Sequence, residues 1–374
     1  MGTTVTEQLT HNEELADFDT LTGRYQRELM AHCYRMSGSV HEAEDLVQET
    51  FLRAWKASAN FQGRSSVRTW LYKIATNVCL TNLEGRPRRP LPAGLGTADS
   101  IAGDALEQDA DIPWLEPIPD AAVEVAERDT IRLAFVAALQ HLPARQRAVL
   151  ILRDVLRWSA AETATVLDTT TAAVNSALQR AHAQLDERGL TPDTVEQDLD
   201  DAQQLMLDAY LEAFWAKDVD RIVKLLQYDA TWDMPPFLNH YRGAANIGDL
   251  IDKQCPGGVH DMPMLRTVAN GQPAFGLYMR QADGHFEPFH MQVLDVVAAA
   301  QAPSRLHAFA WRLPIRSSSG AGAALWRLIV PPAPSANASR ESSMCPSRSA
   351  RRQRSHGVGR HRCAGVTVAS VLRV

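Results

Sequence analysis

The side chains best suited to contact a specific ligand lie on one face of a helix predicted near residues 170–185. The buried side of this helix is marked by four apolar residues at helical spacing: Val174, Leu178, Ala181 and Leu185. The opposite face carries small hydrogen-bonding groups and one cation: Thr170, Thr171, Asn175, Ser176, Gln179 and Arg180. Groups of this kind can contact base edges and phosphates in the major groove of DNA.

The segments before this helix complete a recognisable unit. Residues 144–156 and 159–167 are predicted helices, and the stretch "DTTT" forms the turn that follows them, with Thr170 as the N-cap of the next helix. This spacing is typical of a helix-turn-helix motif. It also fits a plain three-helix bundle with a solvated polar face, so spacing alone leaves both open.

A second candidate site is a local basic patch. Residues 61–90 contain a single acid, Glu84, and six bases: Arg64, Arg68, Lys73, Arg86, Arg88 and Arg89. Residues 1–314 as a whole carry 28 bases and 43 acids, so a nucleic-acid contact in the main body has to use such a patch. The patch would supply the salt-dependent attraction to phosphates.

The composition divides the chain into two all-α domains, then an α+β domain and a tail. The predicted segments are a helical domain at 15–84, an exposed acidic linker rich in Pro and Gly at 85–120, a helical domain at 121–188, an α+β domain at 201–314 and a basic, disordered tail at 315–374. The linker ends in "DIPWLEPIPD", where Trp114 and Leu115 between prolines could dock on another surface, which the sequence does not identify.

Several classes of protein are excluded by the pattern. The five cysteines show no CxxC or metal-ligand spacing, so no metal and no cofactor are expected. The amino terminus lacks a basic stretch followed by an apolar core, and no apolar run is long enough to span a bilayer. We therefore expect a cytoplasmic protein without a membrane partner.

Three stretches together resemble the extracytoplasmic-function (ECF) sigma factors of bacterial RNA polymerase, in the sigma-70 family. They are "AEDLVQETFLRAW", "FQGRSSVRTWLYKIATN" and "AVNSALQRAHAQL", and the resemblance covers roughly residues 15–188. It implies region 2 and region 4 domains that bind core RNA polymerase and promoter DNA and direct transcription initiation. It also implies that the chain is not an enzyme, because the polymerase performs the chemistry and no catalytic residue is assigned.

The resemblance assigns the first stretch to the clamp of the polymerase β′ subunit. Val47, Phe51, Ala54 and Trp55 would face inward, and Glu49 and Arg53 could pair at i, i+4. The polymerase-binding residues implied are Asp45, Gln48 and Glu49.

The next helix would meet the promoter −10 element. The residues implied are Phe61, Arg64, Arg68, Trp70, Tyr72, Lys73 and Asn77. Asn77 and the loop at 61–66 would hold a flipped base, since an amide offers both a donor and an acceptor. Trp70 could instead be a core residue, and Asn77 a plain surface residue.

The −35 element would be met by the polar face at 170–180, with two departures from the family. Asp168 stands where the turn often has Gly, although Asp tolerates the left-handed conformation. Asn175 stands where Lys or Arg is frequent, which leaves the −35 sequence in doubt.

Residues 201–314 resemble the SnoaL-like, NTF2-type cone on the stretches "DATWDMPPFLNHYRG" and "VANGQPAFGLYMR". Candidate pocket residues are Trp232, Asp233 and His290, with His240, His285, Phe275 and Phe289 nearby. No constellation identifies a catalytic base, so we expect a regulatory domain that contacts the preceding domains and could bind a small-molecule ligand.

Alternatives remain open at this point. The chain could be a SnoaL-like isomerase or cyclase fused to a DNA-binding module. It could also be a sigma-like DNA-binding regulator that no longer engages polymerase. A separate anti-sigma protein could be a further partner.

Overall fold

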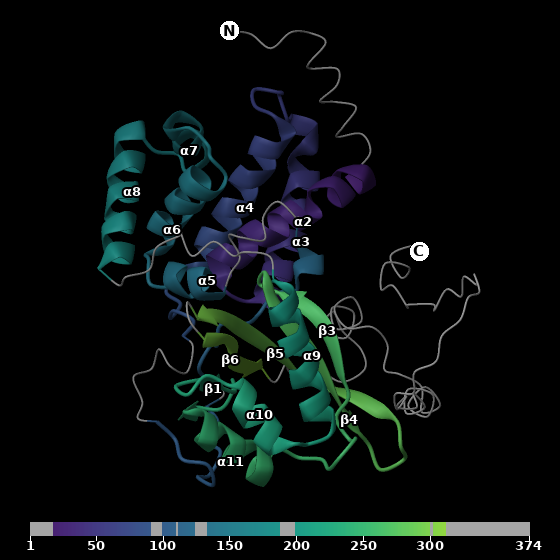
Figure 1. The fold of residues 1–374 in the computed structure, drawn as a ribbon. Helices are drawn as coiled ribbons and strands as arrows, with labels where there is room; N and C mark the ends of the chain where they lie inside the picture. Colours follow the sequence, from purple (N-terminus) through teal and green to yellow (C-terminus); the bar gives the residue numbers. More distant parts are fainter. Residues whose placement is uncertain are drawn as a thin grey trace, which may run out of the picture. The chain divides into compact units, whose positions relative to one another are not determined.

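A computed structural model describes residues 18–90, 99–109, 111–123, 133–187, 199–299 and 302–311. Within these residues the chain forms two helical regions, a linker and a C-terminal α+β region (Figure 1). The predicted disordered tail, 315–374, lies outside them. A search of the described helices finds none that is both long and apolar enough to cross a membrane.

The first helical region, called region 2 below, packs three helices around a common core. They are α2 (Phe18–Ser37), α3 (Val40–Ala57) and α4 (Val67–Leu83), with the short η1 (Ser58–Asn60) after α3. Ser39 and Ser66 cap α3 and α4 by accepting hydrogen bonds from backbone amides three residues on, at 3.2 and 3.1 Å. The caps begin each helix at the residue where its apolar periodicity starts.

The second helical region, called region 4 below, contains the predicted helix-turn-helix. Its elements are α5 (Leu133–Leu139), α6 (Ala144–Leu150), the π-helix η5 (Ile151–Val155), α7 (Ala160–Val166) and α8 (Thr171–Asp186). A capping box between Ser159 and Glu162 starts α7, and Thr170 caps α8. Asp168 in the turn has φ +46°, the left-handed conformation expected for this position.

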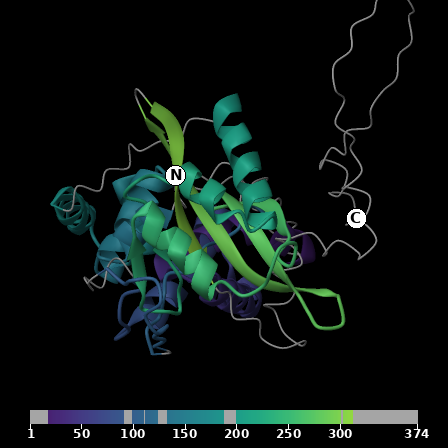
Figure 2. The ribbon, with the colours of Figure 1, turned by 60° about the horizontal axis from the view of Figure 1, so that its bottom comes forward.

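The C-terminal region combines helices with a six-stranded sheet of order β2-β1-β6-β5-β4-β3 (Figures 1 and 2). All neighbouring strands are antiparallel except β1 and β6. The helices are α9 (Asp201–Trp215), α10 (Val219–Leu225) and α11 (Ala244–Gln254). The strands are β1 (Thr231–Asp233), β2 (His240–Arg242), β3 (Met264–Ala269), β4 (Gln272–Arg280), β5 (Phe286–Ala299) and β6 (Ala302–Trp311). The α+β prediction is confirmed.

Both faces of this sheet are buried, and they belong to different cores. Consecutive residues of a strand point to opposite faces of the sheet. Trp232, Phe275, Leu277 and Leu294 share a core with the C-terminal helices. A second set shares the core of the helical regions: Ala274, Tyr278, Met291 and Val293. The sheet therefore joins its own helices to region 2.

The linker between the helical regions is partly buried. Leu115 and Ile118 are fully enclosed in the core shared with region 2, and Trp114 is also buried. The prediction of an exposed linker is wrong here, because these apolar side chains find partners on both sides. The sequence predicts that Trp114 and Leu115 dock on an unspecified surface, and the structure buries both within the chain itself.

Gly38 allows the linker to approach region 2 closely. Its φ of +71° lies in the left-handed region, and a Cβ there would lie 2.9 Å from Leu115 Cδ1. Gly85 has the same conformation, at φ +72°, but faces open space. A comparison of substitutions at the two glycines therefore separates the effect of backbone strain from the effect of crowding.

We predict that both Gly38→Ala and Gly85→Ala lose about 1–2 kcal/mol of unfolding free energy from the left-handed backbone. Gly38→Ala should lose roughly 1–3 kcal/mol more, because the added methyl group overpacks the linker contact. Urea unfolding of the two variants measures the difference. Equal losses would contradict the close approach.

Candidate nucleic-acid interface

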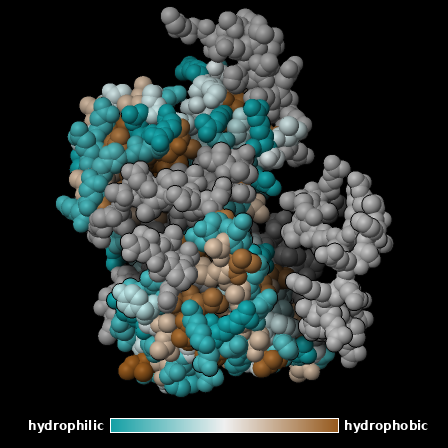
Figure 3. Space-filling model, in the orientation of Figure 1, coloured by the Kyte–Doolittle hydropathy of each residue, from teal (hydrophilic) through white to brown (hydrophobic). Residues whose placement is uncertain are grey.

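The polar face of α8 is presented to solvent as predicted. Thr171, Asn175, Ser176, Gln179 and Arg180 are all exposed, and Figure 3 shows hydrophilic colour over this helix. The Arg180 guanidinium donates to Ser176 Oγ at 2.6 Å, so these two side chains are held together. The apolar side of the helix is anchored by three buried residues: Val174, Ala181 and Leu185. The polar face of α8 is therefore accessible to a groove of DNA.

The loop and helix assigned to the −10 element contain an aromatic pair. The rings of Phe61 and Trp70 lie 4.8 Å apart, and both side chains are half-buried against the core of region 2. Trp70 is thus partly a core residue, the alternative considered for it. Arg64 and Asn77 are exposed, as a DNA contact requires.

Tyr72 is buried in this conformation, so the −10 contact assigned to it would require a rearrangement and stays a prediction. Its ring is fully buried, and its hydroxyl donates to Glu28 Oε1 at 3.0 Å. The ring centroid lies 5.1 Å from that of Trp158 in region 4. Packing between the two regions has turned a predicted surface aromatic into a core residue.

Two cations of the basic patch are also engaged by neighbouring groups. Arg68 pairs with Glu28, and its guanidinium lies 5.1 Å from the ring centroid of Tyr72 and 5.7 Å from that of Trp158. Lys73 Nζ lies 2.6 Å from Asp168 Oδ1 in the helix-turn-helix turn. Region 4 therefore contacts the side of α4 that was assigned to the −10 element.

The outward face of α3 is a stripe of exposed residues. Asp45, Gln48, Leu52 and Trp55 recur at helical spacing, and Trp55 is 61% exposed. The prediction that Trp55 faces inward is wrong, although Val47, Phe51 and Ala54 are buried as predicted. The predicted pair forms, with Arg53 Nε donating to Glu49 Oε1 at 2.7 Å.

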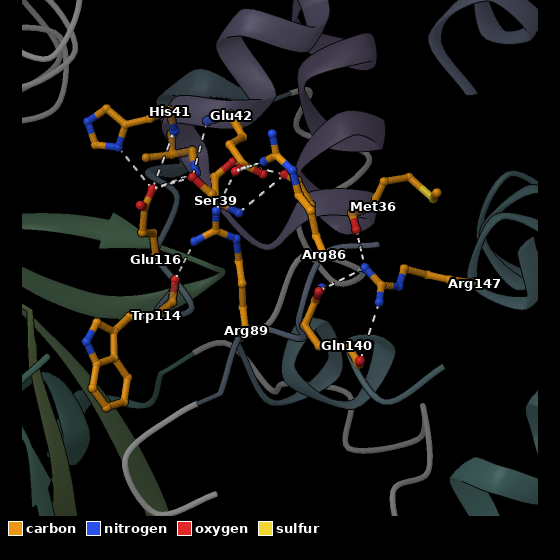
Figure 4. Close-up of polar contacts among 12 residues, drawn as sticks. Met36, Ser39, His41, Glu42, Arg86, Arg89, Trp114, Glu116, Gln140 and Arg147 are labelled. Carbon is orange, nitrogen blue, oxygen red and sulfur yellow. Dashed lines mark hydrogen bonds and ion pairs between the residues drawn. The ribbon is translucent and has the colours of Figure 1, made fainter. Parts of the chain in front are cut away.

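Sequence patterns did not reveal a carboxylate that caps α3 from the linker (Figure 4). Glu116 Oε2 accepts from Ser39 Oγ at 2.8 Å, Val40 N at 3.0 Å and His41 N at 3.4 Å. His41 Nδ1 lies 3.0 Å from the same oxygen. Burial raises the pKa of Glu116, but the bonds from His41 and Ser39 and the nearby Arg89 outweigh it and leave the pKa lowered. An anion is favoured at this helix terminus.

A turn of the C-terminal sheet completes the anchoring of the linker. Asn270 Nδ2 donates to Tyr34 Oη at 2.9 Å, and Asn270 Oδ1 accepts from Ile118 N at 2.8 Å. Tyr34 Oη donates to the Glu116 carbonyl at 2.7 Å. Asn270 has φ +55° and precedes Gly271, so the Asn-Gly pair was the available signal for a tight turn here.

The predicted pocket in the C-terminal region does not assemble from its candidate residues. Trp232 and Asp233 are both buried, but consecutive strand residues point to opposite faces of the sheet. Asp233 Oδ1 lies 2.6 Å from His240 Nδ1, which raises the pKa of His240 although burial opposes the shift. His290 Nε2 lies 3.1 Å from Gln292 Nε2.

The remaining pocket candidates are divided between surface and core. His285 is exposed, whereas Phe275 is buried and Phe289 is half-buried. Among the described residues, no group of three or more His, Cys, Asp or Glu side chains is placed to hold a metal ion.

Comparison with protein families matches both helical regions. Residues 21–89 match the model for Sigma-70 region 2, and residues 132–185 match the model for Sigma-70, region 4. The matches coincide with the three-helix core of α2–α4 and with the helix-turn-helix. They confirm the resemblance inferred from the sequence.

Curated relatives extend the similarity into the C-terminal region. The chain is 51% identical over 302 residues to "ECF RNA polymerase sigma factor SigG" of Mycobacterium tuberculosis strain H37Rv, covering 77% of this chain and 80% of the relative. It is 28% identical over 219 residues to the SigJ sigma factor of the same strain, covering 59% and 64% of the two chains.

A solved structure gives the same fold. The crystal structure of the M. tuberculosis ECF sigma factor SigJ aligns over 79% of this chain and 96% of its own, with a TM-score of 0.50 and 22% identity. ECF sigma factors are transcription initiation factors without an enzymatic activity of their own, so the alternative of a fused isomerase or cyclase is set aside. The chain belongs to the ECF family of RNA polymerase sigma factors.

Proposed function

We propose that the chain directs core RNA polymerase to a set of promoters by reading the −35 element with α8 and the −10 element with the loop at 61–66 and α4. The exposed polar face of α8 carries this proposal. It presents donors, acceptors and a cation at the spacing a major groove accepts. The exposed Arg64 and Asn77 would contribute to −10 contacts.

The polymerase would bind the stripe on α3. Asp45 and Gln48 flank an exposed apolar pair, Leu52 and Trp55, and a large exposed aromatic is typical of a protein interface. By family resemblance the partner surface is the clamp of the β′ subunit. Glu49 would act with Asp45 to meet a basic surface there.

The conformation described here would have to open before both elements are read. Elements centred at −35 and −10 are roughly 25 base pairs apart, or about 85 Å along the duplex at 3.4 Å per pair. In this conformation Lys73 of the −10 surface touches Asp168, two residues before the cap of α8. We infer that the closed arrangement is a resting form.

The C-terminal region would regulate the change by holding the linker. Its Asn270 binds both the linker backbone at Ile118 and Tyr34 of region 2, while Glu116 of the linker caps α3. Loss of these bonds would free the linker that the two helical regions need for separation. A small-molecule ligand or an anti-sigma protein could act on the same contacts.

Run-off transcription with core polymerase, on promoters selected from a random library, tests the function. Transcripts that depend on the added protein would support a sigma factor. Sequence-specific binding of the free protein to duplex promoter, with no transcript, would support the alternative of a regulator that no longer engages polymerase.

The α3 stripe gives one prediction. Trp55→Ala should weaken binding to core polymerase roughly tenfold, about 1.4 kcal/mol, because it removes a large apolar contact. Tyr228→Ala is the matched control, since Tyr228 is an aromatic residue of the C-terminal region and is 78% exposed. Binding is measured by fluorescence anisotropy of the labelled protein. Equal effects of the two changes would exclude the stripe as the docking surface.

The linker contact gives a second prediction. Asn270→Gly deletes both side-chain hydrogen bonds and keeps the left-handed backbone unstrained. It should raise run-off transcription several-fold relative to the unchanged protein, roughly 3–10-fold for about 1 kcal/mol of lost closure. His260→Gly, at φ +64° in the same region, is the control and should leave transcription unchanged. An unchanged transcript level with Asn270→Gly would remove the regulatory role of this contact.

The Glu116 contact gives a third prediction, with a pH dependence. Glu116→Gln should lose about 1–3 kcal/mol of unfolding free energy at pH 7, because charge-assisted bonds to α3 are lost. The lowered pKa means that the carboxylate stabilises the fold above its ordinary value of 4.5, and that this stabilisation is lost as the pH falls through the folded-state pKa.

The difference in unfolding free energy between Glu116→Gln and the unchanged protein should therefore disappear at acidic pH. Urea unfolding from pH 7 down to about pH 3 follows it. Glu107→Gln, an exposed change in the same linker, should stay within about 0.5 kcal/mol throughout. A gap that is constant with pH would show that Glu116 does not act as an ion.

A further inference from the structure

A cavity of about 480 Å³ lies where region 2, the linker and region 4 meet, and its lining is basic. Four arginines line it, Arg86, Arg88, Arg89 and Arg147, against two carboxylates, Glu42 and Asp111. This is an excess of two positive charges in a chain whose net charge is −6. A local excess of this sign attracts anions.

One of the two carboxylates, that of Glu42, is shared between two of the arginines. Glu42 Oε1 lies 2.5 Å from Arg86 Nη1 and 2.7 Å from an Arg89 nitrogen (Figure 4). Arg89 also donates to the Trp114 carbonyl at 2.9 Å. A single carboxylate between two guanidinium groups leaves one positive charge unbalanced.

Arg147 adds a buried cation held by neutral groups alone. It is 5% exposed and donates to the Met36 carbonyl, to Gln140 Oε1 at 2.8 Å and to the Leu142 carbonyl at 3.2 Å (Figure 4). In the part of the chain that the structure describes, no carboxylate lies within ion-pair distance of it. Burial lowers its pKa to about 10, so it stays charged at neutral pH.

The buried side chains of Arg147 and Gln140 also carry hydrogen-bond donors that are not used. Among the described residues, neither Arg147 Nε nor Gln140 Nε2 has a hydrogen-bond partner, and both side chains are at least nine-tenths buried. A buried cation without a counter-charge is costly, and each buried donor left unpaired adds to the cost. An anion in the cavity would offset part of this cost.

We propose that this cavity binds a small phosphorylated anion. Its volume falls in the range of small-molecule sites, about 300–1,000 Å³. The planar guanidinium fork matches phosphate oxygens in pairs, and two excess charges match a phosphate group. A duplex cannot reach Arg147, because the group is almost fully enclosed.

The position of the cavity gives the ligand a role. Arg86, Arg88 and Arg89 follow α4 of region 2, whereas Gln140 and Arg147 belong to region 4. A bound phosphate would link the two regions and favour the closed arrangement. This role rests on the proposed function, in which separation of the regions is required, but the binding itself does not.

Titration calorimetry of the full chain with inorganic pyrophosphate, without divalent cations, tests the site. We expect saturable binding, weakened roughly tenfold by Arg88→Gln. Arg88 is exposed and contacts His141 Nδ1 at 2.7 Å, so this change spares the core. The matched control is Arg221→Gln, which removes an exposed ion pair with Glu212 in the C-terminal region and should leave binding unchanged.

A comparison of two ligands, ADP and pyrophosphate, identifies the source of the phosphate group. Tighter binding of ADP than of pyrophosphate would indicate a nucleotide, and equal binding a free phosphate anion. No saturable binding of either below about 1 mM, or equal loss in Arg88→Gln and Arg221→Gln, would overturn the proposal. Weaker binding of Arg88→Gln to random-sequence duplex, by the same factor as to pyrophosphate, would overturn it in favour of a nucleic-acid contact.

Amide hydrogen exchange then tests the link between the regions, with no polymerase present. Pyrophosphate should slow exchange in residues 140–147 of the unchanged protein and not in Arg88→Gln. Binding of pyrophosphate without slower exchange would support the binding site but contradict the proposal that the ligand links the two regions. Failure of Asn270→Gly to raise transcription would affect the proposed function and leave this result untouched.

Discussion

The Glu116 carboxylate at the amino terminus of α3 is the interaction on which the arrangement of the chain depends. It satisfies the first backbone amides of that helix and complements the positive end of the helix dipole. Its own backbone carbonyl is held by Tyr34, which Asn270 reaches from the sheet. One short linker segment is thus bound by region 2 on one side and by the C-terminal region on the other.

The contacts between regions 2 and 4 include both exposed and buried ones. The Lys73–Asp168 pair is exposed, and exposed pairs contribute at most about 1 kcal/mol. The edge-to-face contact between the rings of Tyr72 and Trp158 adds an aromatic contribution of similar size. Buried contacts add to these, because the two regions share one hydrophobic core and Arg147 donates to the Met36 carbonyl. The proposed opening would therefore need a partner that binds the open form more tightly than the closed form.

The C-terminal sheet buries both of its faces, and this explains why it cannot be treated as an appended module. Met291 and Val293 lie in the core of the helical regions, while Leu294 lies in the core with α9, α10 and α11. The same alternation places Trp232 and Asp233 on opposite faces of the sheet, so these two side chains do not line one pocket together. The excess positive charge lies outside the sheet, in the cavity beside α4.

Local patterns in the sequence determined the helices, the helix-turn-helix, the left-handed turn at Asp168 and the exposed polar face of α8. Each of these depends on residues within a few positions of one another, where periodicity and capping act. The family resemblance implied the partners of α3 and α4, but it placed Trp55 inward and assigned Tyr72 to a DNA contact. Only the tertiary structure decided these two positions, the burial of the linker and the role of Glu116. The physical reason is that burial and charge pairing depend on partners tens of residues away, such as Trp158 for Tyr72 and Ser39 for Glu116, which no local pattern records.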